Sequence, residues 1–201
     1  MTTGATITEV LNIFFRWLHV LFGIIWVGLL YFFNFINAYF SKTLDAPTKE
    51  KVFPELMTRA LFFFRWAAMA TFLFGLILLY INYLGPDHVA SLNSIRGEWI
   101  ILGGGLGTIM WFNVWFIIWP SQKRIIEGIK TRTPVHSAFL ARSTMASKIN
   151  VYLSIPLIFA MLAASGHFIH GSWYWVVGVI LIGFFIASQL YVLAEKIGLK
   201  N

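Results

Sequence analysis

Five long runs of apolar residues, separated by shorter polar stretches, account for most of this chain. Each run is close to the ~20 residues that an α-helix needs to cross the hydrocarbon of a bilayer. Leu, Ile, Phe and Trp fill the runs continuously, whereas the surface helices of a soluble protein carry apolar residues on one face only. The pattern predicts five transmembrane helices, at about residues 12–38, 59–83, 99–119, 149–169 and 173–194.

Composition supports an all-α integral membrane protein, because the 201 residues are 59% hydrophobic and only 11% charged. No polar linker is long enough to separate a second domain, so we expect one membrane domain over residues 1–201. The polar segment 1–11 lacks a basic region, and we expect no cleaved signal peptide. Pro120 follows the third apolar run and is expected to end that helix at the membrane surface.

Lysine and arginine are divided unevenly between the two ends of the predicted bundle. Twelve lie on the side that receives the 39–58 loop, the 120–148 loop and the C-terminus, against only Arg16 and Arg96 near the other surface. Because positive loops stay in the cytoplasm, we expect a multi-pass protein of the bacterial inner membrane with a periplasmic N-terminus and a cytoplasmic C-terminus. The net charge of +7 therefore needs no nucleic-acid partner, and no nucleic-acid-binding motif is present.

Two histidines, His19 and His167, interrupt the first and fourth apolar runs. An ionisable residue at membrane depth is costly and indicates a functional site. The first span starts at the outer surface and the fourth ends there, so the two imidazoles are expected at similar depths in the outer leaflet. Such a pair suits a haem iron with two axial histidines. We therefore predict a non-covalent haem b ligated by His19 and His167, with His170 as the rival for His167.

A haem also needs space between helices, which glycine provides. Gly23, Gly103 and Gly107 are predicted to line that space within a four-helix haem-binding bundle, with the fifth helix outside it. Gly75, in the outer half of the second span, lies at a similar depth. Arg16 lies one turn above His19, where its guanidinium would pair with a haem propionate. Each of these residues also has an alternative role without haem. The glycines would allow close helix packing, and the arginine would reach the membrane surface. The histidines would make interhelical hydrogen bonds or bind another metal.

Two further features limit the cofactors and the kinds of catalysis that this sequence permits. The sequence has no cysteine, which excludes disulfides, iron–sulfur clusters ligated by this chain and haem attached through C-x-x-C-H. No nucleophile–base constellation is apparent, so no catalytic residue is assigned.

Asn34 and Asn113 lie within the apolar runs and are expected to hold helices together by hydrogen bonds.

Several motifs carry a resemblance to a known family. They are Arg16-Trp17-Leu18-His19, the run Asn113-x-Trp115-x-x-x-Trp119-Pro120, and Ala163-Ala164-Ser165-Gly166-His167. Over the first four spans the chain resembles the membrane part of the bacterial urate oxidase N-terminal-domain family, whose members are associated with urate hydroxylation. Many members carry a C-terminal cytochrome c domain, which this sequence lacks. The resemblance implies that a periplasmic cytochrome c, or a larger redox complex, replaces that domain.

The function that these features favour is a membrane b-type haem subunit. It would pass electrons between quinone, or a periplasmic carrier, and a partner protein. Two alternatives remain open. One is a haem-dependent oxidoreductase acting on urate or on a porphyrinogen, since Leu18-His19 also resembles the first span of haem-type protoporphyrinogen oxidases. The other is a cofactor-free anchor subunit that holds a larger complex in the membrane.

Overall fold

The computed structural model describes residues 6–86, 88, 90–167 and 172–198, and this part contains helices and no strands. The first span comprises α1 (Ile7–Tyr31), a π-helical segment (Phe32–Asn37) and α2 (Ala38–Thr43), and the second comprises α3 (Ala46–Leu79) and a π-helical segment (Tyr80–Leu84). The third comprises α4 (Ile95–Phe112), a π-helical segment (Asn113–Ile118) and α5 (Trp119–Thr131). The fourth comprises α6 (Ser137–Leu162) and a π-helical segment (Ala163–His167), and the fifth is α7 (Trp173–Gly198).

Within the described residues, five helical stretches are long and apolar enough to cross a membrane, which confirms the predicted number of spans. They reach 37, 39, 37, 29 and 25 residues, so most extend well beyond the ~20 residues that hydrocarbon requires. Much of the predicted 39–58 and 120–148 loops is therefore helix. The apolar run defines only the part of a helix that lipid can cover, because a helix continues into water wherever its backbone remains bonded.

The prediction that Pro120 ends the third helix is wrong, since α5 continues from Trp119 to Thr131. Proline lacks an N–H and its ring crowds the carbonyl four residues earlier. Here the π-helical segment Asn113–Ile118 leads directly into α5, and Pro120 lies in the first turn of α5. The wider turn and the early position make the proline compatible with a continuous helix.

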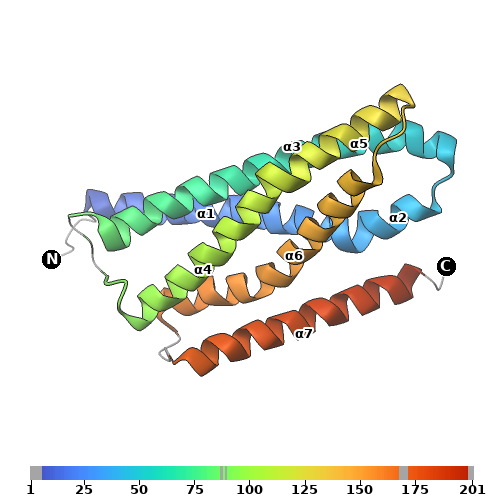
Figure 1. Ribbon diagram of the computed structural model, residues 1–201. Coiled ribbons are helices and arrows are strands. Elements are labelled where there is room, and N and C mark those ends of the chain that lie inside the picture. The colour runs from blue at the N-terminus through green and yellow to red at the C-terminus, as the bar shows by residue number, and fades with distance from the viewer. Residues whose placement is uncertain (1–5, 87, 89, 168–171, 199–201) are drawn as a thin grey trace.

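The first four spans form a ring of neighbours (Figure 1). α1 and α3 form one antiparallel pair, and α4–α5 and α6 form another. α3 contacts α4 and α5, and α6 contacts α1, so the two pairs close into a four-helix bundle. α7 packs outside the bundle, against α6 and the π-helical segment of the first span. The architecture is thus four helices plus one.

Aromatic side chains join the two pairs along the contact between α3 and α4–α5. Phe72 stacks on Trp111 with 4.4 Å between ring centroids, and Trp66 meets Trp115 edge to face at 5.3 Å. Further along the same contact, the guanidinium carbon of Arg65 lies 3.8 Å from the ring centroid of Trp119. Stacked rings bury much apolar surface and keep an orientation, which fixes the pairs against each other.

Hydrogen bonds between polar side chains join the pairs on the other side, where α6 provides partners to the first span. The Tyr31 hydroxyl lies 2.8 Å from that of Ser154. Asn34 donates to the Ser147 hydroxyl at 2.8 Å and accepts from the Tyr191 hydroxyl of α7 at 2.9 Å. Asn34 therefore bonds to both α6 and α7, as expected for a residue that holds helices together.

Asn113 makes the corresponding bond within the second pair. Its amide donates to Asn150 Oδ1 at 2.8 Å, and the Asn150 amide donates to the Met110 carbonyl at 3.0 Å. Asn150 is fully buried, with no exposed surface. The structural role predicted for Asn113 is confirmed.

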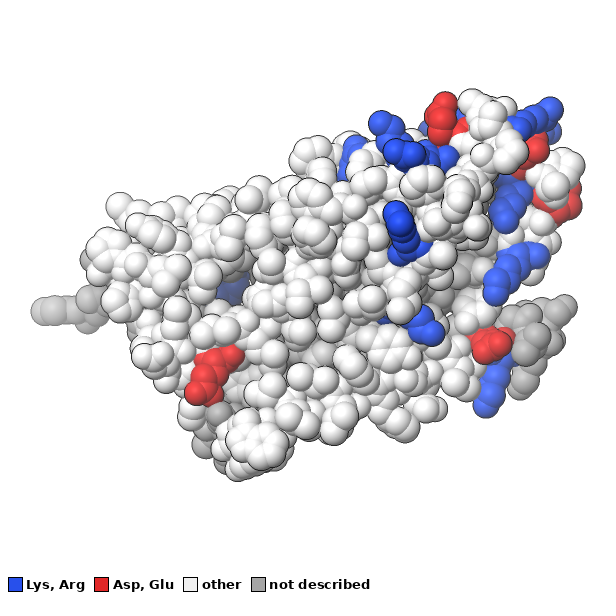
Figure 2. Space-filling view, viewed as in Figure 1, with Lys and Arg blue, Asp and Glu red and all other residues white. Residues whose placement is uncertain are grey.

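The outer surface of the bundle has the character that a lipid bilayer requires. Large apolar side chains are exposed along the outward faces, and charged side chains gather at the end formed by α2, the start of α3 and the end of α5 (Figure 2). The N- and C-terminal ends lie at opposite ends of the bundle (Figure 1). The charge asymmetry expected from the sequence is thus a feature of the folded molecule.

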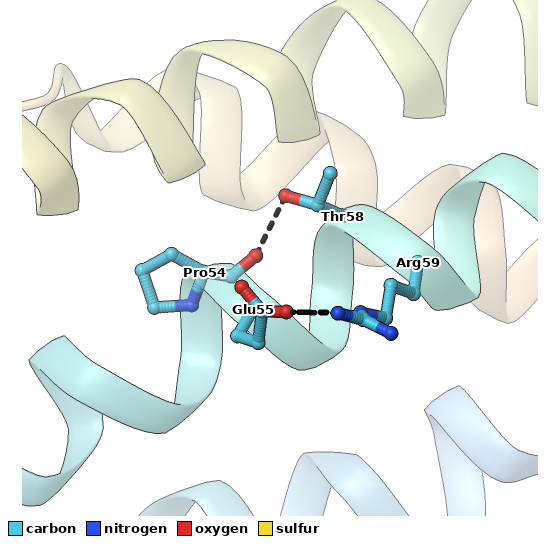
Figure 3. Close-up of polar contacts among 4 residues, drawn as sticks. All are labelled: Pro54, Glu55, Thr58 and Arg59. Carbon is cyan, nitrogen blue, oxygen red and sulfur yellow. Dashed lines mark hydrogen bonds and ion pairs between the residues drawn. The ribbon is translucent and has the colours of Figure 1, made fainter.

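At the charged end, α3 continues as a helix through Pro54. Around it, the Thr58 hydroxyl donates to the Pro54 carbonyl at 2.6 Å, and Arg59 pairs with Glu55 at 2.6 Å (Figure 3). A second ion pair, between Arg132 and Glu50 at 3.0 Å, joins the end of α5 to the start of α3. Exposed pairs such as these contribute about 0.2–1 kcal/mol each.

The packing of α7 gives a test of the fold. At Gly183 of α7, an added Cβ would lie 2.8 Å from Pro156 Cδ and 3.2 Å from its nitrogen. The proline ring and helix backbone cannot rotate away, so Gly183→Ala is expected to lower the free energy of unfolding by about 1–3 kcal/mol. Thermal unfolding in detergent measures this. Gly178→Ala, on the same helix with nothing within 4 Å, is the control and should leave stability unchanged or raise it. Equal effects of the two substitutions would contradict the packing.

Candidate functional site

His19 lies on α1, half-buried, and its ring faces α3. Nδ1 is 2.8 Å from the backbone carbonyl oxygen of Thr71. A carbonyl oxygen only accepts, so Nδ1 of the neutral ring must carry the proton and donate it. Nε2 then holds a lone pair, and it has no hydrogen-bond partner among the residues that the structure describes. This is the arrangement in which histidine ligates a metal, with one nitrogen fixed by a carbonyl and the other available.

Gly75 provides the space that the His19 ring occupies. A Cβ on Gly75 would lie 3.1 Å from His19 Cε1 and 3.3 Å from Nδ1. Thr71 lies one helical turn earlier on the same face of α3, and its own hydroxyl donates to the Ala67 carbonyl at 2.8 Å. Gly75 was expected near the histidines, as a glycine in the outer half of the second span, whereas Thr71 was not expected at the site. Their four-residue spacing places them on one face of a helix, but only the structure shows that His19 faces it.

The three glycines predicted to line the haem lie at two different contacts. Gly23 faces α3, with its nearest neighbour, Thr71 Cγ2, 3.8 Å from an added Cβ. Gly103 and Gly107 face α6, where an added Cβ would lie 2.8 Å from Met161 Cε and 3.4 Å from Leu157 Cδ1, respectively. These glycines let α4 and α6 approach closely. Their role in holding a cofactor stays a prediction.

Arg16 lies on α1 one turn before His19 and is exposed. Its guanidinium donates to Asn12 Oδ1 at 3.1 Å, and the Asn12 amide donates to Asn82 Oδ1 at 2.6 Å. Arg16, Asn12 and Ile81 help to line a hollow of about 230 Å³ between α1 and the end of the second span. Arg16 makes no ion pair with a described residue, so its remaining N–H groups are free to bind an anion.

The second predicted ligand is described less completely. His167 is the last residue of the π-helical segment that ends the fourth span, but its side chain lies outside the description, as does the whole of His170. This end of the fourth span lies at the same end of the bundle as the start of α1 (Figure 1). Arg96 Nε donates to the Ala164 carbonyl at 3.1 Å and ties the segment to α4.

Within the described ranges, no group of three or more His, Cys, Asp or Glu side chains is arranged to hold a metal ion. A haem iron takes four ligands from its porphyrin and needs only one or two from the protein. The described residues therefore provide one histidine with an unpaired ring nitrogen, and the pairing with His167 stays a prediction.

Comparison with known families now adds to this geometry. The family model described as Urate oxidase N-terminal matches residues 87–200, which is more than half of the chain. The chain belongs to this family. The match includes Gly103, Gly107 and His167, whereas Arg16, His19 and Gly23 precede it. No curated protein and no solved structure matches the chain. The family resemblance inferred from the sequence is confirmed.

The contact between His19 and α3 can be tested without any cofactor. Gly75→Val is expected to displace the ring and break its bond to Thr71, because the added carbons would occupy the ring's position. Nitrogen NMR of ¹⁵N-histidine-labelled protein, with His19 assigned by its loss in His19→Gln, should show a single Nδ1–H tautomer in the wild type and mixed tautomers in the variant. Gly105→Val, with nothing within 4 Å, is the control. A wild-type ring protonated at Nε2 would contradict the geometry.

Proposed function

We propose that this protein is a membrane electron-transfer subunit that binds a non-covalent haem b, with His19 and His167 as axial ligands. The observation that carries the proposal is the bond from His19 Nδ1 to the Thr71 carbonyl, which leaves Nε2 unpaired, while Gly75 faces Cε1 and Nδ1 of the same ring. A half-buried histidine on a membrane-spanning helix is costly unless it has a partner on both ring nitrogens, and a haem iron would be the missing one.

Each residue of the site has a distinct role in this proposal. The Thr71 carbonyl orients the His19 ring and makes Nε2 more basic, which strengthens its bond to iron. Arg16 pairs with a propionate near the membrane surface through the N–H groups that Asn12 leaves unused. The haem supplies a one-electron Fe³⁺/Fe²⁺ couple. The surrounding apolar helices exclude water and influence the reduction potential of that couple.

The positions of the charged side chains indicate which membrane surface the haem faces. Because Lys and Arg gather at the end of the bundle opposite the start of α1, we place that charged end in the cytoplasm of a bacterial inner membrane. His19 is then near the periplasmic surface. A periplasmic cytochrome c, or a larger redox complex, is the partner that this arrangement favours, and quinone in the membrane is the alternative route.

Family membership favours a second function, an oxidoreductase that acts on urate with the same haem. The two functions differ in what reduces the iron. Addition of urate to the oxidised protein should reduce the haem if urate is a substrate. A haem that responds to quinol or to a reduced cytochrome, and not to urate, supports the electron-transfer subunit.

The axial ligands are tested by the absorption spectrum of the purified protein. His19→Ala and His167→Ala are each expected to abolish the low-spin haem b spectrum or convert it to high spin, because one axial ligand is lost. His88→Ala and His136→Ala are the matched controls, since both histidines lie between helices, where they bond to the backbone. They should leave the spectrum unchanged.

Three outcomes would count against the ligand assignment. If the spectrum survives in His167→Ala and is lost in His170→Ala, His170 is the second ligand. If both His19→Ala and His167→Ala keep the wild-type spectrum, the haem site is elsewhere. A colourless protein that remains colourless after haem is added would leave the cofactor-free anchor as the function.

The side from which electrons enter can be measured in sealed, right-side-out membrane vesicles. A membrane-impermeant reductant added outside is expected to reduce the haem quickly, because a haem near the outer surface avoids transfer across a core ~30 Å thick. Inverted vesicles are the control and should react slowly until they are broken. The opposite pattern would place the haem nearer the cytoplasm and overturn the proposed orientation.

A further inference from the structure

A second hollow lies at the opposite end of the molecule from His19, and the haem proposal does not use it. It has a volume of about 560 Å³ and lies between α6 and the continuous stretch formed by the π-helical segment and α5. Its floor is made of small or short side chains, including Ser121 and Ala146, which are 5% and 4% exposed. These residues keep the groove open between two helices that are otherwise in contact.

One half of the groove is apolar and opens toward lipid. Phe116, Met145 and Ile149 line it and are 59%, 61% and 40% exposed. Phe116 belongs to the predicted hydrocarbon part of the third span and Ile149 to that of the fourth. Side chains of this kind, exposed at membrane depth, contact acyl chains in the bilayer.

The other half of the groove is basic. Arg124 and Arg142 line it from the two facing helices, and both are exposed. The guanidinium carbon of Arg124 lies 4.7 Å from the ring centroid of Phe139, which holds its planar group at the groove wall. Neither arginine forms an ion pair with a described residue, and no lining residue is acidic. Two unpaired positive charges therefore face one concave surface.

The depth of the arginines matches that of lipid headgroups. Arg124 follows the predicted hydrocarbon part of the third span, which ends near Trp119, by five residues, or roughly 7 Å along a helix. Arg142 precedes that of the fourth span by seven residues, or roughly 10 Å. The polar headgroup region begins directly outside the hydrocarbon and is several ångströms deep on each side.

We infer that this groove is a binding site for an anionic phospholipid. The phosphate lies between the guanidinium groups of Arg124 and Arg142, and one acyl chain lies along Phe116 and Ile149. Arginine presents N–H groups in a planar fork that suits phosphate oxygens, and basic pockets between membrane helices bind anionic headgroups in this way. The amphipathic lining matches a ligand with one charged and one apolar end. A free phosphate would leave the apolar half without a partner.

Native mass spectrometry of the intact protein, released from detergent with added lipid, tests the site. The probes are phosphatidylglycerol and phosphatidylcholine with identical acyl chains, which differ in net headgroup charge. The wild type is expected to retain one phosphatidylglycerol in preference to phosphatidylcholine. Arg124→Gln with Arg142→Gln should lower that preference by roughly tenfold or more, at about 1 kcal/mol per basic residue near the surface.

The matched control removes the same charge from the same end of the molecule. Lys123→Gln with Lys130→Gln changes two exposed residues of α5 that do not line the groove, and it should keep the preference. Equal losses in the two double variants would mean unspecific attraction and would overturn the site. Both arginines are exposed, so the unfolding temperature of the arginine variant should equal that of the wild type. A large decrease would assign the arginines to stability instead.

Two further measurements identify the occupant. Inorganic phosphate at millimolar concentration should not displace the lipid, because it cannot fill the apolar half. Displacement by phosphate alone would contradict a lipid site. A neutral isoprenoid quinone that binds at the groove as strongly in the arginine variant as in the wild type, with no phosphatidylglycerol preference in either, would show that the groove is a quinone site.

Discussion

The interior of a bilayer offers no water, so a buried polar side chain of this protein is costly unless a neighbouring helix supplies its partner. α6 supplies many of those partners. Its Asn150 bonds to the third span, and its Ser147 and Ser154 bond to the first. The hydrophobic effect does not drive helices together in hydrocarbon, because lipid tails are as apolar as leucine, so hydrogen bonds and close packing select the neighbours. The polar side chains of α6 therefore specify which helices surround it, and the aromatic contacts of α3 complete the ring.

The π-helical segments obey the same constraint. Such a turn is wider than an α-helical one and alters the backbone bonding around it. Asparagine side chains donate to carbonyls four residues earlier in two of these spans, from Asn34 to Leu30 and from Asn82 to Leu78, both at 2.8 Å. The bond from His19 to the Thr71 carbonyl belongs to this pattern of side chains that bond to backbone in the membrane. It differs because imidazole has a second nitrogen.

Hydropathy was sufficient to predict five spans, because length and apolarity are what a bilayer demands of any helix. The expectation that proline would end the third helix failed at Pro120, where the preceding π-helical turn accommodates the proline. His19 and Asn113 were recognisable because polar residues are rare in apolar runs. Gly75 was recognisable as a glycine in the outer half of the second span, but its contact with His19 was not. Thr71 gave no signal, since its bond to His19 depends on which face of α3 meets α1. Sequence periodicity gives the faces of a helix, but side-chain contacts across helices decide the pairing.

The two ends of the bundle differ in charge, and continuous helices connect them. His19 belongs to the N-terminal part of the first span, which starts at the end with few charges, and the groove between Arg124 and Arg142 lies toward the charged end. The third span runs as one helical stretch from Ile95 to Thr131, past both regions. A close-packed helix transmits position along its axis, so whatever fixes the basic end relative to the headgroups also fixes the depth of the other end. A lipid held in the groove would thus set how far the His19 end lies from the opposite membrane surface.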